Sequence, residues 1–295
     1  MLLKVGTRAS PLAVAQAKAV IYKIQENFSD IKCEIVKIQT TGDRLYQADL
    51  HLLGGKGLFL KEIEMQLISK EIDIAVHSMK DVPAVTPEGL IIDFVLERED
   101  PRDVFISLNA KSPEELHEGA IVGTCSSRRR AFLQNFYKQV KVENLRGNIE
   151  TRIRKLHNGV VDAIVIALAG LKRLNMAEHA TAVLDVDKFI PAIGQGAIGV
   201  ECRIDDNKVI EILQSIHHAE THCCILAERA FLKAFGGDCS TPIAAYAKLV
   251  DNEIFFNSSF FEINRKKMIY SKLHAKASDA ILVGQKAAAE ILSLI

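Results

Sequence analysis

A lysine and an aspartate stand side by side directly after an apolar run near the end of the first third of the chain. Residues 72–76 (IDIAV) have the character of a buried strand, and residues 77–83 (HSMKDVP) follow it. Pro83 ends such a strand because it has no backbone N–H to donate. Lys80 beside Asp81 is typical of an acid/base carboxylate held near a cation, while a cap at the surface end of a strand is equally compatible with these residues.

A second cluster with chemical potential is a basic run in the middle of the chain. Residues 121–155 carry nine Lys and Arg residues against two Glu residues. Arg128, Arg129 and Arg130 stand where a helix is expected to begin, so each opposes the helix dipole by a few tenths to about 1 kcal/mol. Because arginine pairs with carboxylates and phosphates, the run predicts a small ligand with several negative charges. The alternative is a solvated basic face.

Other candidate groups are less specific. Residues 235–242 (FGGDCSTP) place Cys239 in a glycine-rich turn, where it is either a small buried group or an exposed thiol that anchors something. Residues 54–57 (GGKG) lack the spacing of a Walker P-loop and are interpreted as a flexible loop. His218 and His222 have helical spacing, but a helix surface is favoured over a metal site, and no metal is expected.

The elements that must position these groups alternate between strands and helices. Strands are expected at 2–5, 33–38, 72–76, 121–124, 142–145 and 163–167, with helices between them. Ser10 and Pro11 suit the start of a helix, as a cap and as the first helical residue. This alternation predicts an α/β fold, and the similar segments 73–76 and 162–165 suggest two related lobes. Ligands bind beyond the carboxyl ends of strands in such folds, so Arg8, Asp81 and the arginine cluster are expected to converge on one cleft.

The last third of the chain changes character. Asp251-Asn252 separates two strand-like segments and signals a hairpin. A third strand near 268–273 and a helix from 278 to the C-terminus complete a small α+β domain.

The composition excludes some classes of function. The formal net charge of the 295 residues is zero, so no global field attracts nucleic acid or a membrane surface. No stretch of eighteen apolar residues without charge occurs, and the N-terminus does not resemble a signal peptide. We therefore expect a cytoplasmic protein that binds neither nucleic acid nor membrane, with six free cysteines that show no CxxC spacing.

Six short motifs together resemble the porphobilinogen deaminase family, also called the hydroxymethylbilane synthases. They cover nearly the whole chain in order and are residues 7–13 (TRASPLA), 54–59 (GGKGLF), 77–83 (HSMKDVP), 98–103 (REDPRD), 145–148 (LRGN) and 191–196 (PAIGQG). The resemblance implies an enzyme that condenses four porphobilinogen molecules head to tail, releases ammonia each time and yields linear hydroxymethylbilane. It also implies a dipyrromethane cofactor attached through a thioether to Cys239, and we expect a monomer.

The resemblance further implies three domains. The first two are lobes like those of periplasmic binding proteins, formed by residues 1–96 with 197–215 and by residues 97–196. The third is the small α+β domain, residues 216–295, which carries Cys239. Residues 97–103 and 191–196 would be hinges between the lobes.

Residue roles follow from the resemblance position by position. Asp81 matches the catalytic aspartate, whose carboxylate would stabilise the cation formed when ammonia leaves and help move protons. The positions that match cofactor-binding residues are Cys239, Ser78, Lys80, Asp81, Thr124, Ser126, Arg128, Arg129, Arg146 and Gly147. The positions that match substrate-binding or product-binding residues are Arg8, Ser10, Gln16, Arg152 and Arg173.

Two positions depart from the family pattern. Asp238 precedes Cys239 where glycine is common, and Cys125 places a second thiol beside the arginine cluster. A different class of function, a cytoplasmic two-lobed protein that merely binds an anionic small molecule, requires neither Asp81 nor an anchoring thiol at Cys239. A nucleic-acid binder would show affinity that falls steeply with salt.

Overall fold

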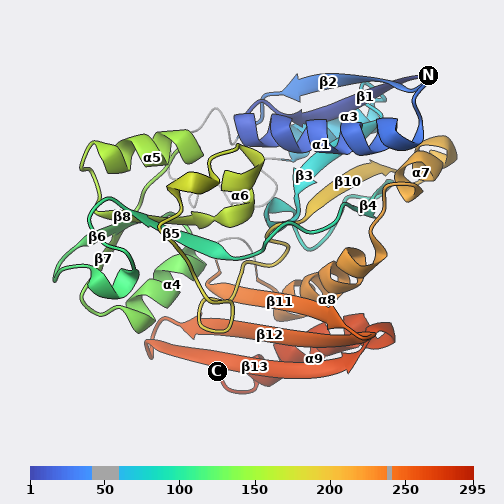
Figure 1. Ribbon diagram of the computed structural model, residues 1–295. Helices are drawn as coiled ribbons and strands as arrows, with labels where there is room; N and C mark the ends of the chain where they lie inside the picture. Colours follow the sequence, from blue (N-terminus) through green and yellow to red (C-terminus); the bar gives the residue numbers. More distant parts are fainter. Residues whose placement is uncertain (42–59, 238–240) are drawn as a thin grey trace. The chain divides into compact units, whose positions relative to one another are not determined.

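The computed structural model describes residues 1–41, 60–237 and 241–295 of the chain (Figure 1). These residues form two compact units. Unit 1 comprises Met1–Glu99 and Ala197–Ile225, and unit 2 comprises Asp100–Gly196 and Leu226–Ile295. The chain therefore crosses between the units three times. The first crossing lies within the proposed hinge 97–103, and the second comes directly after the proposed hinge 191–196. The three-domain division with its stated boundaries stays a prediction.

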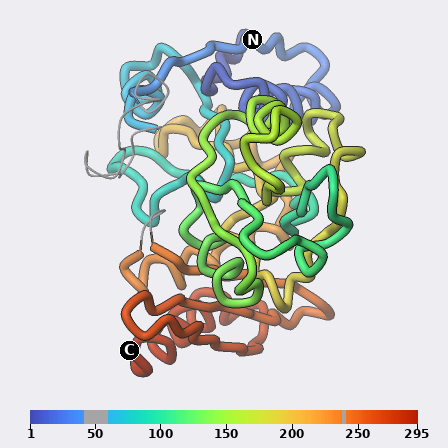
Figure 2. The backbone as a smooth tube through the Cα atoms, turned by 90° about the vertical axis from the view of Figure 1, so that its left-hand side faces the viewer, coloured from blue at the N-terminus to red at the C-terminus, as the bar shows by residue number. Residues whose placement is uncertain are grey.

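Unit 1 is built on one mixed sheet with helices on both faces. Its strands in spatial order are β2 (Lys32–Ile38), β1 (Leu2–Arg8), β3 (Ile74–Ser78), β10 (Ile198–Arg203) and β4 (Leu90–Val95). β1 runs parallel to β2 and β3, whereas β10 returns antiparallel between β3 and β4. Figure 2 shows β10 in amber among the blue and cyan strands.

Alternating side chains of β3 divide the core of unit 1 into two layers. Ile74 and Val76 pack against α1 (Pro11–Asn27) and α7 (Asn207–Gln214). Ala75, one residue out of phase, packs against α3 (Lys61–Ile68) on the opposite face. A strand that is apolar on both faces must be covered on both, and this explains the continuous apolar run in the sequence.

Unit 2 contains a second five-stranded sheet of the same kind. Its strands in spatial order are β7 (Lys141–Glu143), β6 (Ile121–Gly123), β8 (Ala163–Ala167), β5 (Asp103–Ser107) and β9 (Ala182–Val183). Helix α4 (Ser127–Phe136) packs on one face, while α5 (Ile149–His157) and α6 (Leu168–Arg173) pack on the other.

The C-terminal part of unit 2 is the predicted α+β domain. Strands β11 (Ile243–Val250), β12 (Glu253–Glu262) and β13 (Lys267–Lys276) form an antiparallel sheet, against which α9 (Ala280–Leu292) packs. Asp251 and Asn252 both have positive φ, 48° and 64°, as the two-residue hairpin turn requires. Helix α8 (Ala219–Phe235) leads from unit 1 into this domain. The predicted fold class, two α/β lobes and a small C-terminal α+β domain, is confirmed.

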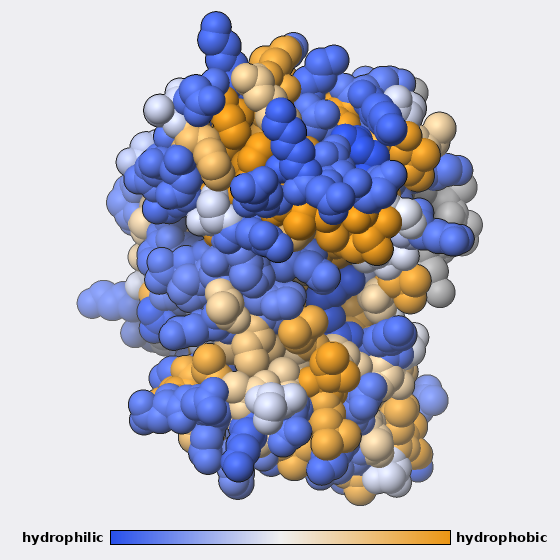
Figure 3. Space-filling view, turned by 90° about the vertical axis from the view of Figure 1, so that its right-hand side faces the viewer, coloured by the Kyte–Doolittle hydropathy of each residue, from blue (hydrophilic) through white to orange (hydrophobic). Residues whose placement is uncertain are grey.

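The surface shows no single large apolar area on the face seen in Figure 3, where hydrophobic clusters are separated by hydrophilic side chains. Within the described part of the chain, no helix is long and apolar enough to cross a membrane.

Candidate active site

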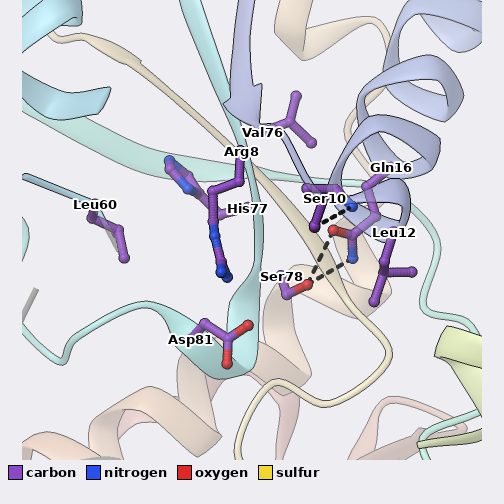
Figure 4. A pocket seen from close by; sticks show the side chains of 10 residues that line it. Arg8, Ser10, Leu12, Gln16, Leu60, Val76, His77, Ser78 and Asp81 are labelled. Atoms are coloured by element: carbon purple, nitrogen blue, oxygen red, sulfur yellow. Dashed lines mark hydrogen bonds between the residues drawn. The ribbon is translucent and has the colours of Figure 1, made fainter. Parts of the chain in front are cut away.

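A pocket in unit 1 lies at the carboxyl ends of β1 and β3, beside the start of α1 (Figure 4). It is lined by Arg8, Ser10, Leu12, Ala13, Gln16, Leu60, Val76, His77, Ser78 and Asp81. Five of the residues singled out from the sequence are thus brought together, namely Arg8, Ser10, Gln16, Ser78 and Asp81. They come from two segments that are far apart in the chain, residues 8–16 and 78–81, as the strand-end rule predicts.

The start of α1 is fixed by local sequence. Ser10 is the cap, and its hydroxyl accepts a hydrogen bond from the N–H of Ala13 at 3.3 Å, while Pro11 occupies the first helical position. One turn later Gln16, which is buried, donates through Nε2 to the Ser78 hydroxyl at 2.7 Å. The Ser78 hydroxyl also lies 3.1 Å from Oε1 of Gln16. Two proposed ligand-binding residues therefore hold α1 against the end of β3 (Figure 4).

Asp81 lies in a short 3-10 turn, η2 (Met79–Asp81), that follows β3 directly. Met79 and Val82 are buried on either side of it, whereas Asp81 itself is exposed. The N–H of Met79 donates to the carbonyl of Ala197 at 3.1 Å, which fixes the start of the turn. The apolar neighbours thus anchor a turn that presents a carboxylate to the pocket. Lys80, in the same turn, is half-buried and is not among the pocket-lining residues.

Behind the pocket lies a buried polar pair that the sequence analysis missed. Nε2 of His77 lies 2.9 Å from Oε2 of Glu201 on β10, and the two side chains are 5% and 1% exposed. Glu64 on α3 is close enough that burial and the negative charge of Glu201 raise its pKa to about 6, against an opposing effect of His77. A buried glutamate in the otherwise apolar stretch 197–202 (AIGVEC) was the signal that could have revealed the pair.

In unit 2 the arginines at the start of α4 are buried around one carboxylate. Ser126 caps this helix by accepting from the N–H of Arg129. Oδ2 of Asp103 accepts from Nη2 of Arg128 at 2.6 Å, and Oδ1 accepts from Nε and Nη2 of Arg129 at 3.0 and 2.7 Å. The sequence analysis expected the compensating anion from a ligand, and the structure provides one within the chain, on β5.

The remaining predicted residues of unit 2 lie at the ends of its strands and helices. The hydroxyl of Thr124, just beyond β6, accepts from the N–H of Ser126 at 3.2 Å. Gly147 has a φ of 133° and precedes α5, and its carbonyl accepts from Nε of Arg152 at 2.8 Å. Nη2 of Arg173, at the end of α6, donates to the carbonyl of Gly196 at 2.6 Å. Arg146, in the same loop as Gly147, accepts through its carbonyl from Lys155.

Some expectations lie beyond these observations. Cys239, with Asp238 before it, and the loop at 54–57 fall outside the described residues. That the pocket residues of unit 1 and the arginine cluster of unit 2 converge on one cleft stays a prediction. Within the ranges that the structure covers, no group of three or more His, Cys, Asp and Glu side chains is arranged to hold a metal ion.

Comparison with known families settles which proteins this chain is related to. Residues 3–211 match the dipyrromethane cofactor binding domain of porphobilinogen deaminase, and residues 222–293 match its C-terminal domain. A porphobilinogen deaminase of Acidithiobacillus ferrooxidans is 45% identical over 291 residues, which cover 99% of this chain and 94% of that protein. The chain belongs to the porphobilinogen deaminase family. The chloroplastic porphobilinogen deaminase of Oryza sativa subsp. japonica is 51% identical over 250 residues, or 83% of this chain and 70% of that one.

Solved structures show only remote similarity to this chain. The methionine binding protein MetQ covers 73% of this chain and 89% of its own, with 15% identity and a TM-score of 0.46. The VFT2 domain of BvgS from Bordetella pertussis covers 73% and 86%, with 18% identity and a TM-score of 0.44.

Membership of the family confirms several predictions made from the motifs. The chain is a transferase of tetrapyrrole biosynthesis, a hydroxymethylbilane synthase, with a dipyrromethane cofactor. The donors present in unit 2 fit a cofactor with carboxylate side chains. Two guanidinium groups share one carboxylate there, and Nε of Arg128 is buried without a hydrogen-bond partner.

Proposed function

We propose that the pocket at the ends of β1 and β3 is the catalytic centre of this hydroxymethylbilane synthase and that Asp81 is its catalytic carboxylate. The observation that carries the proposal is that Asp81 lines one pocket with Arg8, Ser10, Gln16 and Ser78. A carboxylate beside a cation and three polar groups suits a reaction in which positive charge develops on an anionic substrate.

The chemistry gives Asp81 a definite task. When ammonia leaves porphobilinogen, the carbon–nitrogen bond breaks and positive charge spreads over the pyrrole ring. A carboxylate fixed at the pocket wall stabilises that charge, accepts a hydrogen bond from the pyrrole N–H and takes up the proton that is lost when the new carbon–carbon bond forms. Asp81 is exposed at the end of an anchored turn, so it is accessible and held in place.

The other predicted residues recognise carboxylates. Each pyrrole of the substrate carries an acetate and a propionate, which arginine and hydroxyl groups bind well. In this proposal Arg8, Ser10, Gln16, Arg152 and Arg173 hold the incoming substrate or the growing chain. The acidic side chains of the cofactor are held by Ser78, Lys80, Thr124, Ser126, Arg128, Arg129, Arg146 and Gly147.

The dipyrromethane, attached to Cys239 in this proposal, supplies the pyrrole position to which the first substrate molecule is joined. The attachment is tested by intact mass under denaturing conditions, comparing the parent protein with Cys239→Ser. We expect the mass of two linked pyrrole units on the parent alone. An unmodified parent that stays unmodified after incubation with porphobilinogen would overturn the attachment and favour a two-lobed protein that only binds an anionic ligand.

The role of Asp81 is tested by replacement. Asp81→Asn keeps the size of the side chain and removes the charge, so we expect the fold to be retained and most turnover to be lost, by 10² or more. Asp30→Asn, an exposed position of the same unit, is the matched control and should leave the rate unchanged. Product formation by Asp81→Asn within a few-fold of the parent rate would refute the role.

Two further properties belong to this proposal. The enzyme acts on porphobilinogen in the cytoplasm, and it acts as a monomer. Size-exclusion chromatography with light scattering checks the second point, with a mass near 32.6 kDa expected.

A further inference from the structure

Asp103 lies between Arg128 and Arg129, so that one negative charge is paired with two positive charges. One carboxylate accepts hydrogen bonds from two guanidinium groups, and the side chains are 0%, 4% and 7% exposed. Burial of Asp103 raises its pKa, but the two guanidinium groups lower it by more, so that this pKa lies below the usual range. With Asp103 ionised, the buried cluster carries one net positive charge.

The hydrogen bonds use only part of each guanidinium group. Arg128 directs Nη2 to Asp103 and Nη1 to the carbonyl of Ile190 at 2.7 Å, and its Nε is buried without a partner. Arg129 directs Nε and Nη2 to Asp103, while its Nη1 makes no hydrogen bond within the described part of the chain. Each arginine thus keeps at least one nitrogen that has no acceptor in the described part of the chain.

Gln195 completes the arrangement by fixing the carboxylate itself. Its Nε2 donates to Oδ1 of Asp103 at 3.0 Å and to the carbonyl of Pro101 at 2.6 Å. Its Oε1 accepts from Nη2 of Arg129 at 3.4 Å. Oδ1 of Asp103 therefore accepts three hydrogen bonds, which leaves the carboxylate little freedom to rotate.

We infer that Asp103 is a positioning residue that holds Arg128 and Arg129 ready to receive carboxylate groups of the bound cofactor. This inference rests on the proposed function, in which these two arginines bind those groups. A long arginine side chain loses rotamer freedom when it binds a ligand, and this loss is avoided where the side chain is already fixed. The excess positive charge leaves the cluster with a remaining preference for a second anion.

The competing explanation is that Asp103 only stabilises unit 2. The two explanations differ in what happens to cofactor loading in a protein that is still folded. Loading is measured on full-length protein made in cells without porphobilinogen. Intact mass is recorded after incubation with increasing concentrations of porphobilinogen, beside circular dichroism and the thermal midpoint.

Asp103→Asn removes the charge and keeps the shape of the side chain. We expect it to need at least 10-fold more porphobilinogen for half-loading than the parent, at a temperature where both proteins are folded. The matched control is Asp100→Asn, because Asp100 also pairs with an arginine, Arg102, but this pair is less buried, with side chains that are 16% and 45% exposed. This control should load as the parent does. A folded Asp103→Asn that loads at the parent concentration would overturn the inference.

Gln195→Ala serves if Asp103→Asn does not fold, because it keeps every charge and removes the hydrogen bonds of Gln195 with Oδ1 of Asp103, Nη2 of Arg129 and the carbonyl of Pro101. We expect a rise of about 3-fold or more in the half-loading concentration, and unchanged loading would overturn the inference.

Arg129→Leu distinguishes the proposed role of Arg129 in binding the cofactor from the proposed role of Asp103 in positioning Arg129. If it loads normally, the assignment of Arg129 to the cofactor fails; if it fails to load while Asp103→Asn loads normally, only the role of Asp103 fails.

Discussion

His77 and Glu201 form a buried hydrogen bond between neighbouring strands, with Nε2 and Oε2 2.9 Å apart. Strand β10 runs antiparallel to β3 with Gly199 opposite His77, so Glu201 lies two residues further along on the same face. The strand that brings the chain back into unit 1 is thereby tied to the strand that ends at the pocket. His77 directly precedes Ser78 and lines the pocket itself, so this bond also fixes part of the pocket wall.

Removal of the Glu201 side chain should destabilise the protein because His77 would remain buried without its hydrogen-bond partner. We expect Glu201→Ala to lower the free energy of unfolding by about 3 kcal/mol. Urea unfolding at pH 7 measures the loss. Glu88→Ala, at an exposed position of the same unit, should change stability by less than about 0.5 kcal/mol. Equal losses for the two variants would show that the buried bond contributes nothing.

Glu64 makes the stability of the protein depend on pH in a defined window. Its pKa is raised from 4.5 to about 6, first by burial and then by Glu201. The folded state therefore binds this proton more tightly than the unfolded state, and stability falls as the pH rises from about 4.5 to about 6. Above that window the unfavourable contribution is complete and constant.

The variant Glu64→Gln removes this titration and tests the sign. The free energy of unfolding of the parent minus that of the variant should decrease between pH 4.5 and pH 6.5 and then level off. Urea unfolding of both proteins at four or five pH values measures the difference. A difference that stays constant, or rises with pH, contradicts the effect assigned to Glu64.

Local features of the fold were predicted well because short stretches of sequence determine them. The cap at Ser10 and Pro11 and the turn at Asp251-Asn252 depend on residues a few positions apart, and the structure confirms both. The strand-end rule placed Arg8 and Asp81 together, and both line the pocket of unit 1, whereas the convergence of the arginine cluster on the same cleft stays a prediction. The family resemblance added the roles, which neither spacing nor composition determines.

The partners of buried charges could not be predicted from the sequence. Asp103 is 25 and 26 residues from the two arginines that it pairs with, and Glu201 is 124 residues from His77. Which strands become neighbours decides these pairs, since β10 returns between β3 and β4 only in the folded protein. Sequence periodicity carries no information about that choice.

Gly199 provides space for the turn that carries Asp81. A Cβ atom at this position would lie 2.1 Å from Sδ of Met79 and 3.3 Å from Cδ1 of Ile92. Met79 is 2% exposed and begins the turn, so it can move only by disturbing Asp81 or the core beneath. We expect Gly199→Ala to lower the free energy of unfolding by about 2 kcal/mol and to reduce turnover.

A double-mutant cycle with Met79→Ala tests that explanation. Met79→Ala removes the atoms that collide with the new methyl group, so the cost of the double variant should be clearly smaller than the sum of the two single costs. Urea unfolding gives the four free energies. If the losses in the free energy of unfolding are additive, the effect of Gly199→Ala does not arise from the contact with Met79.

The cysteines should differ in reactivity according to their burial. Cys125 is exposed beside the cap of α4, whereas Cys202 is fully buried on β10. Burial, and then the charge of Asp206, raises the pKa of Cys202 to about 12. The thiolate is the reactive form, so Cys202 is protected both by its surroundings and by its protonation.

Treatment with iodoacetamide at pH 8 followed by peptide mass mapping measures these reactivities. We expect Cys125 to be labelled first and Cys202 only after unfolding, with the fast phase absent in Cys125→Ser. If Cys239 carries the cofactor, as proposed, its thioether sulfur should remain unlabelled even in the unfolded parent. Labelling of Cys202 as fast as that of Cys125 would mean that β10 opens readily, which the buried bond between His77 and Glu201 should prevent.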